Sequence, residues 1–300
     1  QSLTTGSAYY FSDHNGYELS GSFAPIDYSL IKSNGDTLRD LGSTWGSVEL
    51  KETYKISLTK PMLVGSEPLT KDNNIKYSGR IELSPVSLEV GGSVTLTPIA
   101  FLEFTLGSTV ATGWHALVFL GLGLNNVENE LPPSDSFQGV LSQSWVTGTF
   151  QFDTAALLSG DTTWKHIVLL TSHTIKYRNF SAANKNDPWF FQGSAGDDFN
   201  GFRYHHTTLL GYQMPLILNT AGILVETQQN IGSVATMSTM ENGGWGSDFT
   251  KIRLGGLFYL KFNEQHSLTI IPQIATRVRY SDDSVKELYF ANRIYSKKCP

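Results

Sequence analysis

One face of the predicted strands carries charged side chains that are suited to handling polar solutes. On that face the N-terminal strands offer Glu18, Glu49, Glu82 and Glu103, and the C-terminal strands offer Lys176, Arg178, Arg203, Lys251, Arg253, Lys261, Arg277, Arg279 and Arg293. An acidic wall facing a basic wall across water would create a transverse field that sorts solutes, because lining charges and diameter set the selectivity of pores. The basic positions favour anionic or zwitterionic solutes. The alternative is that opposite charges pair with each other and fill the space between the walls.

A second candidate chemistry is hydrolysis by a hydroxyl group and a histidine. Ser172 and His173 are adjacent in one predicted strand, and His205 and His206 begin the next. Nucleophilic catalysis needs a hydroxyl within reach of a base, and the base needs an orienting group. Neighbouring residues of a strand point to opposite faces, so His173 cannot activate Ser172. The pattern places His173 and His206 on the outward face, where a cross-strand pair of these two histidines stays open.

Oxygen-bearing side chains gather in one predicted loop. They are Asn184, Asn186, Asp187, Asp197, Asp198 and Asn200. Such oxygens suit calcium, but their spacing is not that of an EF-hand loop. Such a cluster is more often only a solvated loop, and we predict no metal and no cofactor. The single cysteine, Cys299, has no partner for an internal disulfide.

The elements that would position these side chains are long alternating strands, and residues 249–280 give the clearest pattern. One face of the first strand carries Thr250, Ile252, Leu254, Gly256, Phe258, Leu260 and Phe262, and the other carries Lys251, Arg253, Gly255, Tyr259 and Lys261. The alternation resumes after a turn at residues 263–266. Each strand runs for more than ten residues. Soluble strands usually stop at about five or six residues, whereas a tilted transmembrane strand needs about 9–11.

Twelve strands are predicted along the chain after an irregular N-terminal segment, residues 1–15. They are 16–31, 46–58, 75–90, 93–106, 114–124, 138–152, 164–177, 202–216, 222–229, 249–262, 267–280 and 285–295. From Trp114 onward the connections alternate between short (159–163, 218–221, 263–266) and long (125–137, 179–201, 230–248). The first third departs from this rhythm, with a tight hairpin at 90–93 and a long connection at 61–74. We expect residues 16–300 to form one domain.

Composition narrows the functional classes. Charged residues make up 16% of the chain and aromatic residues 12%, and the charged share is below the roughly 25% typical of soluble domains. A net charge of −5 argues against nucleic-acid binding, which calls for a basic patch. The sequence has no run of 18 apolar residues, so no transmembrane helix is predicted. We expect a signal peptide to have been removed before Gln1.

The strands at 249–280, the final strand at 288–295 and the alternating connection lengths resemble bacterial outer-membrane β-barrel proteins of the porin and channel type. The resemblance implies a single closed antiparallel transmembrane barrel of about 12 strands with long loops on one side. Barrels of this kind commonly end on an aromatic residue, whereas residues 296–300 continue past Tyr295 here. The implied partners are membrane lipid and a small polar or anionic solute, with protein contacts through loops 179–201 and 230–248.

The function expected from this resemblance is a passive channel, or a surface-exposed protein, of a Gram-negative outer membrane. The residues expected to line the pore are Glu49, Glu82, Glu103, Lys176, Arg178, Arg203, Lys251, Arg253, Arg277 and Arg279. One alternative is a soluble secreted or capsid-like β-sandwich that binds a partner through its long loops, since sandwiches also have alternating strands and polar turns. The other is an outer-membrane lipid hydrolase.

Overall fold

The computed structural model describes residues 2–10, 47–116, 119–124, 136–158, 163–185, 187, 189–192, 198–232, 250–264, 266–280 and 286–299. Strands dominate this part of the chain, and no α-helix occurs among the described residues. No helix in the same ranges is long and apolar enough to cross a membrane. The predicted all-β class is therefore confirmed.

Twelve strands form one antiparallel sheet and follow one another across it in chain order. They are β1 (Ser2–Tyr10), β2 (Ser47–Pro61), β3 (Asn74–Ser84), β4 (Ser87–Ile99), β5 (Leu102–Gly113), β9 (Leu141–Asp153), β10 (His166–Phe180), β12 (Gly201–Gln213), β13 (Leu218–Ile231), β14 (Lys251–Lys261), β15 (Ser267–Tyr280) and β16 (Lys286–Cys299). Four short strands, β6 (His115–Ala116), β7 (Phe119–Leu120), β8 (Leu122–Leu124) and β11 (Trp189–Phe191), form two small sheets. A 3₁₀ turn, η2 (Thr154–Leu157), follows β9.

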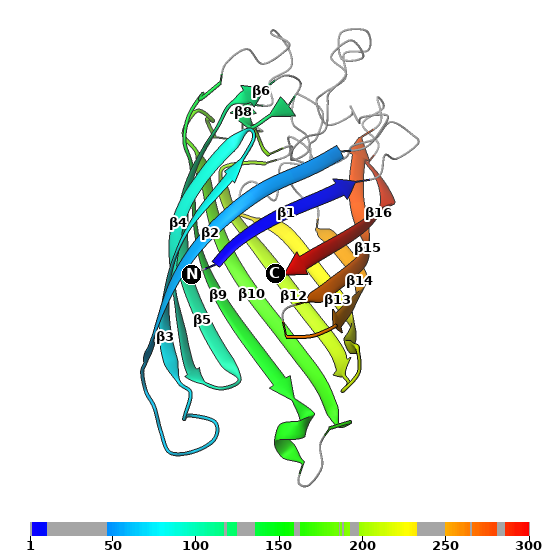
Figure 1. The fold of residues 1–300 in the computed structure, drawn as a ribbon. Coiled ribbons are helices and arrows are strands. Elements are labelled where there is room, and N and C mark those ends of the chain that lie inside the picture. Colours follow the sequence, from blue (N-terminus) through cyan, green and yellow to red (C-terminus); the bar gives the residue numbers. More distant parts are fainter. Residues whose placement is uncertain are drawn as a thin grey trace.

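The large sheet curls strongly, as Figure 1 shows. Its two outermost strands, β1 and β16, lie side by side within contact distance. The described residues form no hydrogen-bonded ladder between these two strands. The connections alternate between the two ends of the sheet because every strand is antiparallel to its neighbours.

The two faces of the sheet differ in chemistry. The apolar face carries large exposed side chains, including Leu50, Tyr54, Ile81, Val90, Phe104, Leu106, Val110, Val146, Ile175, Phe202, Leu210, Ile223, Ile252, Leu254, Phe258 and Ile274. The polar face, formed by the alternate positions, carries the buried side chains of Glu89, Thr95, Thr109, Gln143, Arg178, Arg203 and Gln273. Val146 is 54% exposed, whereas Arg203 is 4% exposed. Soluble antiparallel sheets show the reverse, with apolar side chains against a core and polar ones in water.

The connections alternate as predicted after Trp114, but the short connection expected at 218–221 is misplaced, because Leu218–Ile231 form β13 and the turn is at 214–217. Residues 154–165, 214–217 and 262–266 join strands at one end of the sheet, and the longer connections 114–140, 181–200 and 232–250 join them at the other. The exception predicted in the first third is also present, because β2 and β3 are joined by the long segment 62–73 at the short-turn end.

The first third differs from the prediction in its strand boundaries. Residues 2–10, expected to be irregular, form strand β1 and pair with β2. The hairpin expected at 90–93 is wrong, because Gly91 and Gly92 lie inside β4 and the turns fall at 85–86 and 100–101. A Cβ on Gly91 would lie 2.3 Å from the Thr109 side chain. This glycine therefore permits close approach of β5 rather than a turn. The strand expected at 16–31 lies outside the described residues.

Residues 114–124 were expected to be a strand of the main sheet. Their described part, 114–116 and 119–124, lies outside that sheet and forms, with the described residues of 181–192 and 198–200, what we call the loop layer. Strand β8 pairs with β11, and Trp114 N donates a hydrogen bond to Val86 O over 2.9 Å. The apolar core at this end consists of Ala111, Leu122, Leu141, Phe180 and Trp189, all buried. Strand β8 therefore packs over this end of the sheet, because Leu122 is buried in this core and Leu124 packs against it.

Candidate functional site on the polar face

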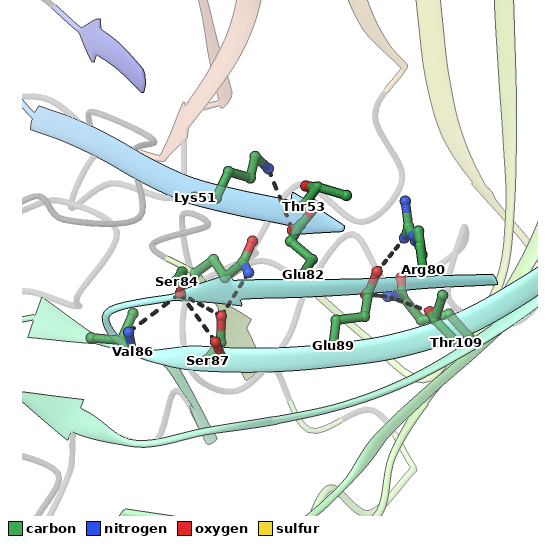
Figure 2. Close-up of polar contacts among 11 residues, drawn as sticks. Lys51, Thr53, Arg80, Glu82, Ser84, Val86, Ser87, Glu89 and Thr109 are labelled. Carbon is green, nitrogen blue, oxygen red and sulfur yellow. Dashed lines mark hydrogen bonds and ion pairs between the residues drawn. The ribbon is translucent and has the colours of Figure 1, made fainter. Parts of the chain in front are cut away.

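Two glutamates face each other across β3 and β4 on the polar face (Figure 2). Glu82 and Glu89 are direct cross-strand partners, an arrangement that is unfavourable for like charges. Each has its own cation: Lys51 Nζ lies 3.6 Å from Glu82 Oε1, and Arg80 forms an ion pair with Glu89. Gln143 Nε2 on β9 donates to Glu89 Oε2 over 3.0 Å. The acidic positions of β3 and β4 are therefore neutralised within their own part of the sheet.

Arg178 on β10 and Arg203 on β12 share the carboxylate of Asp198. Asp198 Oδ1 accepts a hydrogen bond from Arg178 Nη1 over 2.7 Å and from Arg203 Nη1 over 2.5 Å. The three side chains are 10%, 6% and 5% exposed for Arg178, Asp198 and Arg203. Burial alone would raise the pKa of the Asp198 carboxyl, but Arg178 and Arg203 hold that pKa below its ordinary value. Asp198 comes from the loop layer, so this triad, the Arg–Asp–Arg clamp, fixes that layer to β10 and β12.

Hydroxyl and amide groups lie beside further charged side chains on the rest of the described polar face. Cross-strand hydroxyl pairs join Thr95 to Thr105 over 2.9 Å and Thr147 to Thr174 over 2.7 Å. Gln273 Nε2 donates to Glu226 Oε2 over 2.7 Å from two strands away. Lys176 Nζ lies 5.8 Å from the centre of the Trp145 ring, and the described residues show no ion pair for it.

The predicted pore-lining residues fall where the alternation placed them. Glu82, Glu103, Lys176, Arg178, Arg203, Lys251 and Arg253 occupy polar-face positions of their strands. Glu49, Arg277 and Arg279 occupy the polar-face register of β2 and β15, and their side chains lie outside the described ones. Glu82, Arg178 and Arg203 are paired with opposite charges, as in the alternative, whereas Lys176 is not paired within the described residues.

Several polar-face residues were missed by the sequence interpretation. Arg80, Glu89 and Gln143 lie two residues from polar-face positions on their strands, so the period of two could have found them. With the hairpin predicted at 90–93 instead of 85–86, the alternation counted from Glu82 puts Glu89 on the opposite face. Asp198 gave no such signal, because its role depends on the path of a loop rather than on a strand period.

The oxygen-rich loop does not assemble a calcium site from its described members. Asp198 is occupied by two arginines. Asn200 Oδ1 accepts hydrogen bonds from Phe180 N and Trp189 Nε1 over 2.7 and 3.1 Å. Within the described ranges no group of three His, Cys, Asp or Glu side chains is placed to hold a metal ion. Asn186 and Asp197 lie outside the described residues.

A separate polar cluster lies on the apolar face, at the centre of β10 and β12. His173 and His206 are cross-strand partners, and their rings stack with centroids 4.7 Å apart, as the cross-strand interpretation required. His173 Nδ1 lies 2.6 Å from Tyr204 Oη. Ser172 points to the polar face and lies 3.1 Å from Thr149 Oγ1, so it is separated from His173 as predicted.

Comparison with known proteins adds no relative: no protein-family model, no curated protein and no solved structure matches the chain.

Proposed function

We propose that this protein is an outer-membrane β-barrel of a Gram-negative bacterium that acts as a passive channel for small polar or anionic solutes. The observation that carries the proposal is the reversed sidedness of the sheet. Large apolar side chains are exposed on one face while charged side chains are buried on the other. Lipid accounts for the first face, and a polar interior accounts for the second.

The topology supports a wall without free edges. In a bilayer every backbone polar group must be satisfied internally, which limits spanning sheets to closed barrels. An even number of strands, twelve here, brings the first and last strands antiparallel to each other. Strands β1 and β16 already lie in contact (Figure 1). Their pairing would complete the wall.

The part of the polar face around Lys176 favours a channel over a sealed structural wall. Lys176 keeps a positive charge with no described ion pair, next to hydroxyl groups such as Thr147 and Thr174. Glu82 and Glu89 are paired with cations of their own, whereas Lys176 has no ion pair among the described residues. A positive charge on the lining favours anions, because charges on the wall set pore selectivity.

The sandwich alternative agrees less well with the described sheet. A sandwich buries the apolar faces of two sheets against each other. Among the described residues one sheet contains all the long strands, and its apolar side chains, such as Leu106 at 61% exposure, are not covered by other described residues.

Membrane fractionation tests the proposal directly. We expect the protein to stay with outer membranes after a carbonate wash and to migrate faster on gels before heating than after it. Both results follow from a wall whose apolar face is held by lipid and whose strands resist detergent. Release of the folded protein into buffer by carbonate would reject the membrane assignment.

Reversing the charge of Lys176 tests the channel. We expect Lys176→Glu to shift the ion selectivity of channels in planar bilayers toward cations, because it replaces an unpaired positive charge of the polar face. Lys165→Glu is the matched control: it makes the same charge change at an exposed position outside the strands. Selectivity that is equal in the two variants and in the wild type would remove Lys176 from the pore lining.

A further inference from the structure

Five polar side chains form an island in the middle of the apolar face. Thr171 and His173 come from β10, and Tyr204, His206 and Thr208 come from β12. Exposed apolar side chains surround the island along the same strands: Ile167, Ile175, Phe202 and Leu210. Polar and ionisable groups that face lipid are costly and generally functional. The island therefore calls for a role that the channel does not use.

Within the island three residues form a continuous hydrogen-bonded line. Thr171 Oγ1 lies 3.3 Å from His173 Nε2, and His173 Nδ1 lies 2.6 Å from Tyr204 Oη. We propose that Thr171, His173 and Tyr204 form an ester-hydrolase site, in which the Thr171 hydroxyl is the nucleophile, His173 the base and Tyr204 the positioning residue. A nucleophile, a base within hydrogen-bonding reach and a third group that orients the base are the parts such a site needs.

His206 and Thr208 supply hydrogen-bond donors beside the nucleophile. His206 Nε2 lies 3.3 Å from Thr171 Oγ1 and 2.8 Å from Thr208 Oγ1, and Thr208 donates to Thr171 over 3.2 Å. Donors at this place would stabilise the oxyanion that forms on an attacked carbonyl. Metal binding suits the pair less well, because among the described residues no third His, Cys, Asp or Glu is placed to hold a metal ion with them.

The reaction balances with the ester and water alone. In the tautomer with hydrogen on Nδ1, His173 donates to Tyr204 Oη, and its Nε2 accepts the Thr171 proton as Oγ1 bonds to the ester carbonyl carbon. The tetrahedral oxyanion collapses, the bond from carbon to the alcohol oxygen breaks, and the alcohol leaves with the proton from Nε2. Water then attacks the acyl-threonine by the same proton path. The acid leaves and Thr171 regains its proton.

The surroundings select the substrate class. Thr171 lies on the apolar face, where Ile167, Ile175 and Leu210 of the same two strands are each at least half exposed. An acyl chain would lie on these side chains with its ester at the island. Esters of fatty acids are thus the expected substrates, and membrane glycerolipids are their source if the proposed membrane location holds.

Hydrolysis of p-nitrophenyl octanoate in detergent micelles by the purified full-length protein tests the site. We expect turnover by the wild type, and a loss of about 10²–10⁴-fold in kcat for His173→Gln, the usual contribution of a positioned base. Thr171→Val, which keeps the side-chain shape, should abolish turnover, and Thr171→Ser should retain it. Tyr204→Phe should lower kcat while leaving KM unchanged, because Tyr204 orients His173 without binding the chain.

Ser172→Ala is the matched control, because Ser172 lies on the opposite face of the same strand and contacts Thr149. It should keep full activity. Circular dichroism checks that each variant retains its strands, and a fluorophosphonate ester should label Thr171 in the wild type. A wild type without turnover, or a Thr171→Val variant as active as the wild type, would overturn the assignment. The substrate is supplied in micelles, so a failed carbonate wash would reject the membrane location and leave this test standing.

Discussion

Replacing Asp198 by Asn is expected to destabilise the protein by about 3–5 kcal/mol, the usual effect of breaking a buried ion pair from one side. The positive charges of Arg178 and Arg203 would then lack a carboxylate partner. This is costly because the two side chains are only 10% and 5% exposed. The loop layer would lose its ionic attachment to β10 and β12. Guanidinium unfolding of the folded protein in lipid vesicles measures the free-energy difference between variant and wild type.

Asp187→Asn is the matched control for this prediction. It removes the same charge from the same connection, where Asp187 Oδ2 accepts hydrogen bonds from Asn184 N and Nδ2 over 2.9 and 3.1 Å at an exposed site. We expect it to change stability by less than about 1 kcal/mol, because exposed polar contacts contribute little. Equal effects of the two substitutions would mean that the Arg–Asp–Arg clamp does not hold the loop layer.

The same clamp sets a pH dependence. The pKa of Asp198 is lowered in the folded protein from an unfolded value of about 3.9. A carboxyl with a lowered folded pKa contributes stability that is fully present above its unfolded pKa and is lost as pH falls through its folded pKa. The difference between wild type and Asp198→Asn should therefore stay constant from pH 7 down to about 4 and shrink only in more acidic solution. Unfolding curves across this range check it.

Periodicity predicted the faces of the sheet well and the path of its loops poorly. Ile252 and Leu254 opposite Lys251 and Arg253 follow from a period of two that any long strand imposes. A strand register also brings His173 beside His206. By contrast, Gly91 looked like a turn residue, because a sequence does not distinguish a glycine that bends the chain from one that admits a neighbouring strand.

The attachments of the loop layer are beyond a period-based prediction for another reason. Asp198 forms its ion pair with Arg178, 20 residues earlier in the sequence. Gln192 donates a hydrogen bond of 2.7 Å to Ser87 on β4. Such contacts depend on the three-dimensional path of the connection. The sequence showed only that polar residues gather in it, which is why its interpretation as a solvated or calcium-binding loop did not include the clamp.

The exposed apolar face should respond to charge in a way that distinguishes lipid from water. Val146 lies at the middle of β9, 54% exposed, with the apolar Leu106 and Ile175 as its cross-strand neighbours. In a bilayer, Val146→Arg is expected to cost about 2–4 kcal/mol, the cost of a lipid-facing arginine near the midplane of a barrel. In water the same change at an exposed position would stay within about 0.5 kcal/mol.

Leu157→Arg provides the control for this comparison. Leu157 is 76% exposed in the 3₁₀ turn beyond the end of β9, so it would lie outside the hydrocarbon in the proposed orientation. We expect its substitution to have little effect on the free energy of unfolding from vesicles. A large cost for Val146→Arg with a small one for Leu157→Arg places lipid against the middle of the strand, because only a medium without water penalises an exposed arginine there. Small costs at both positions would mean that water covers this face, and the membrane assignment would fall with it.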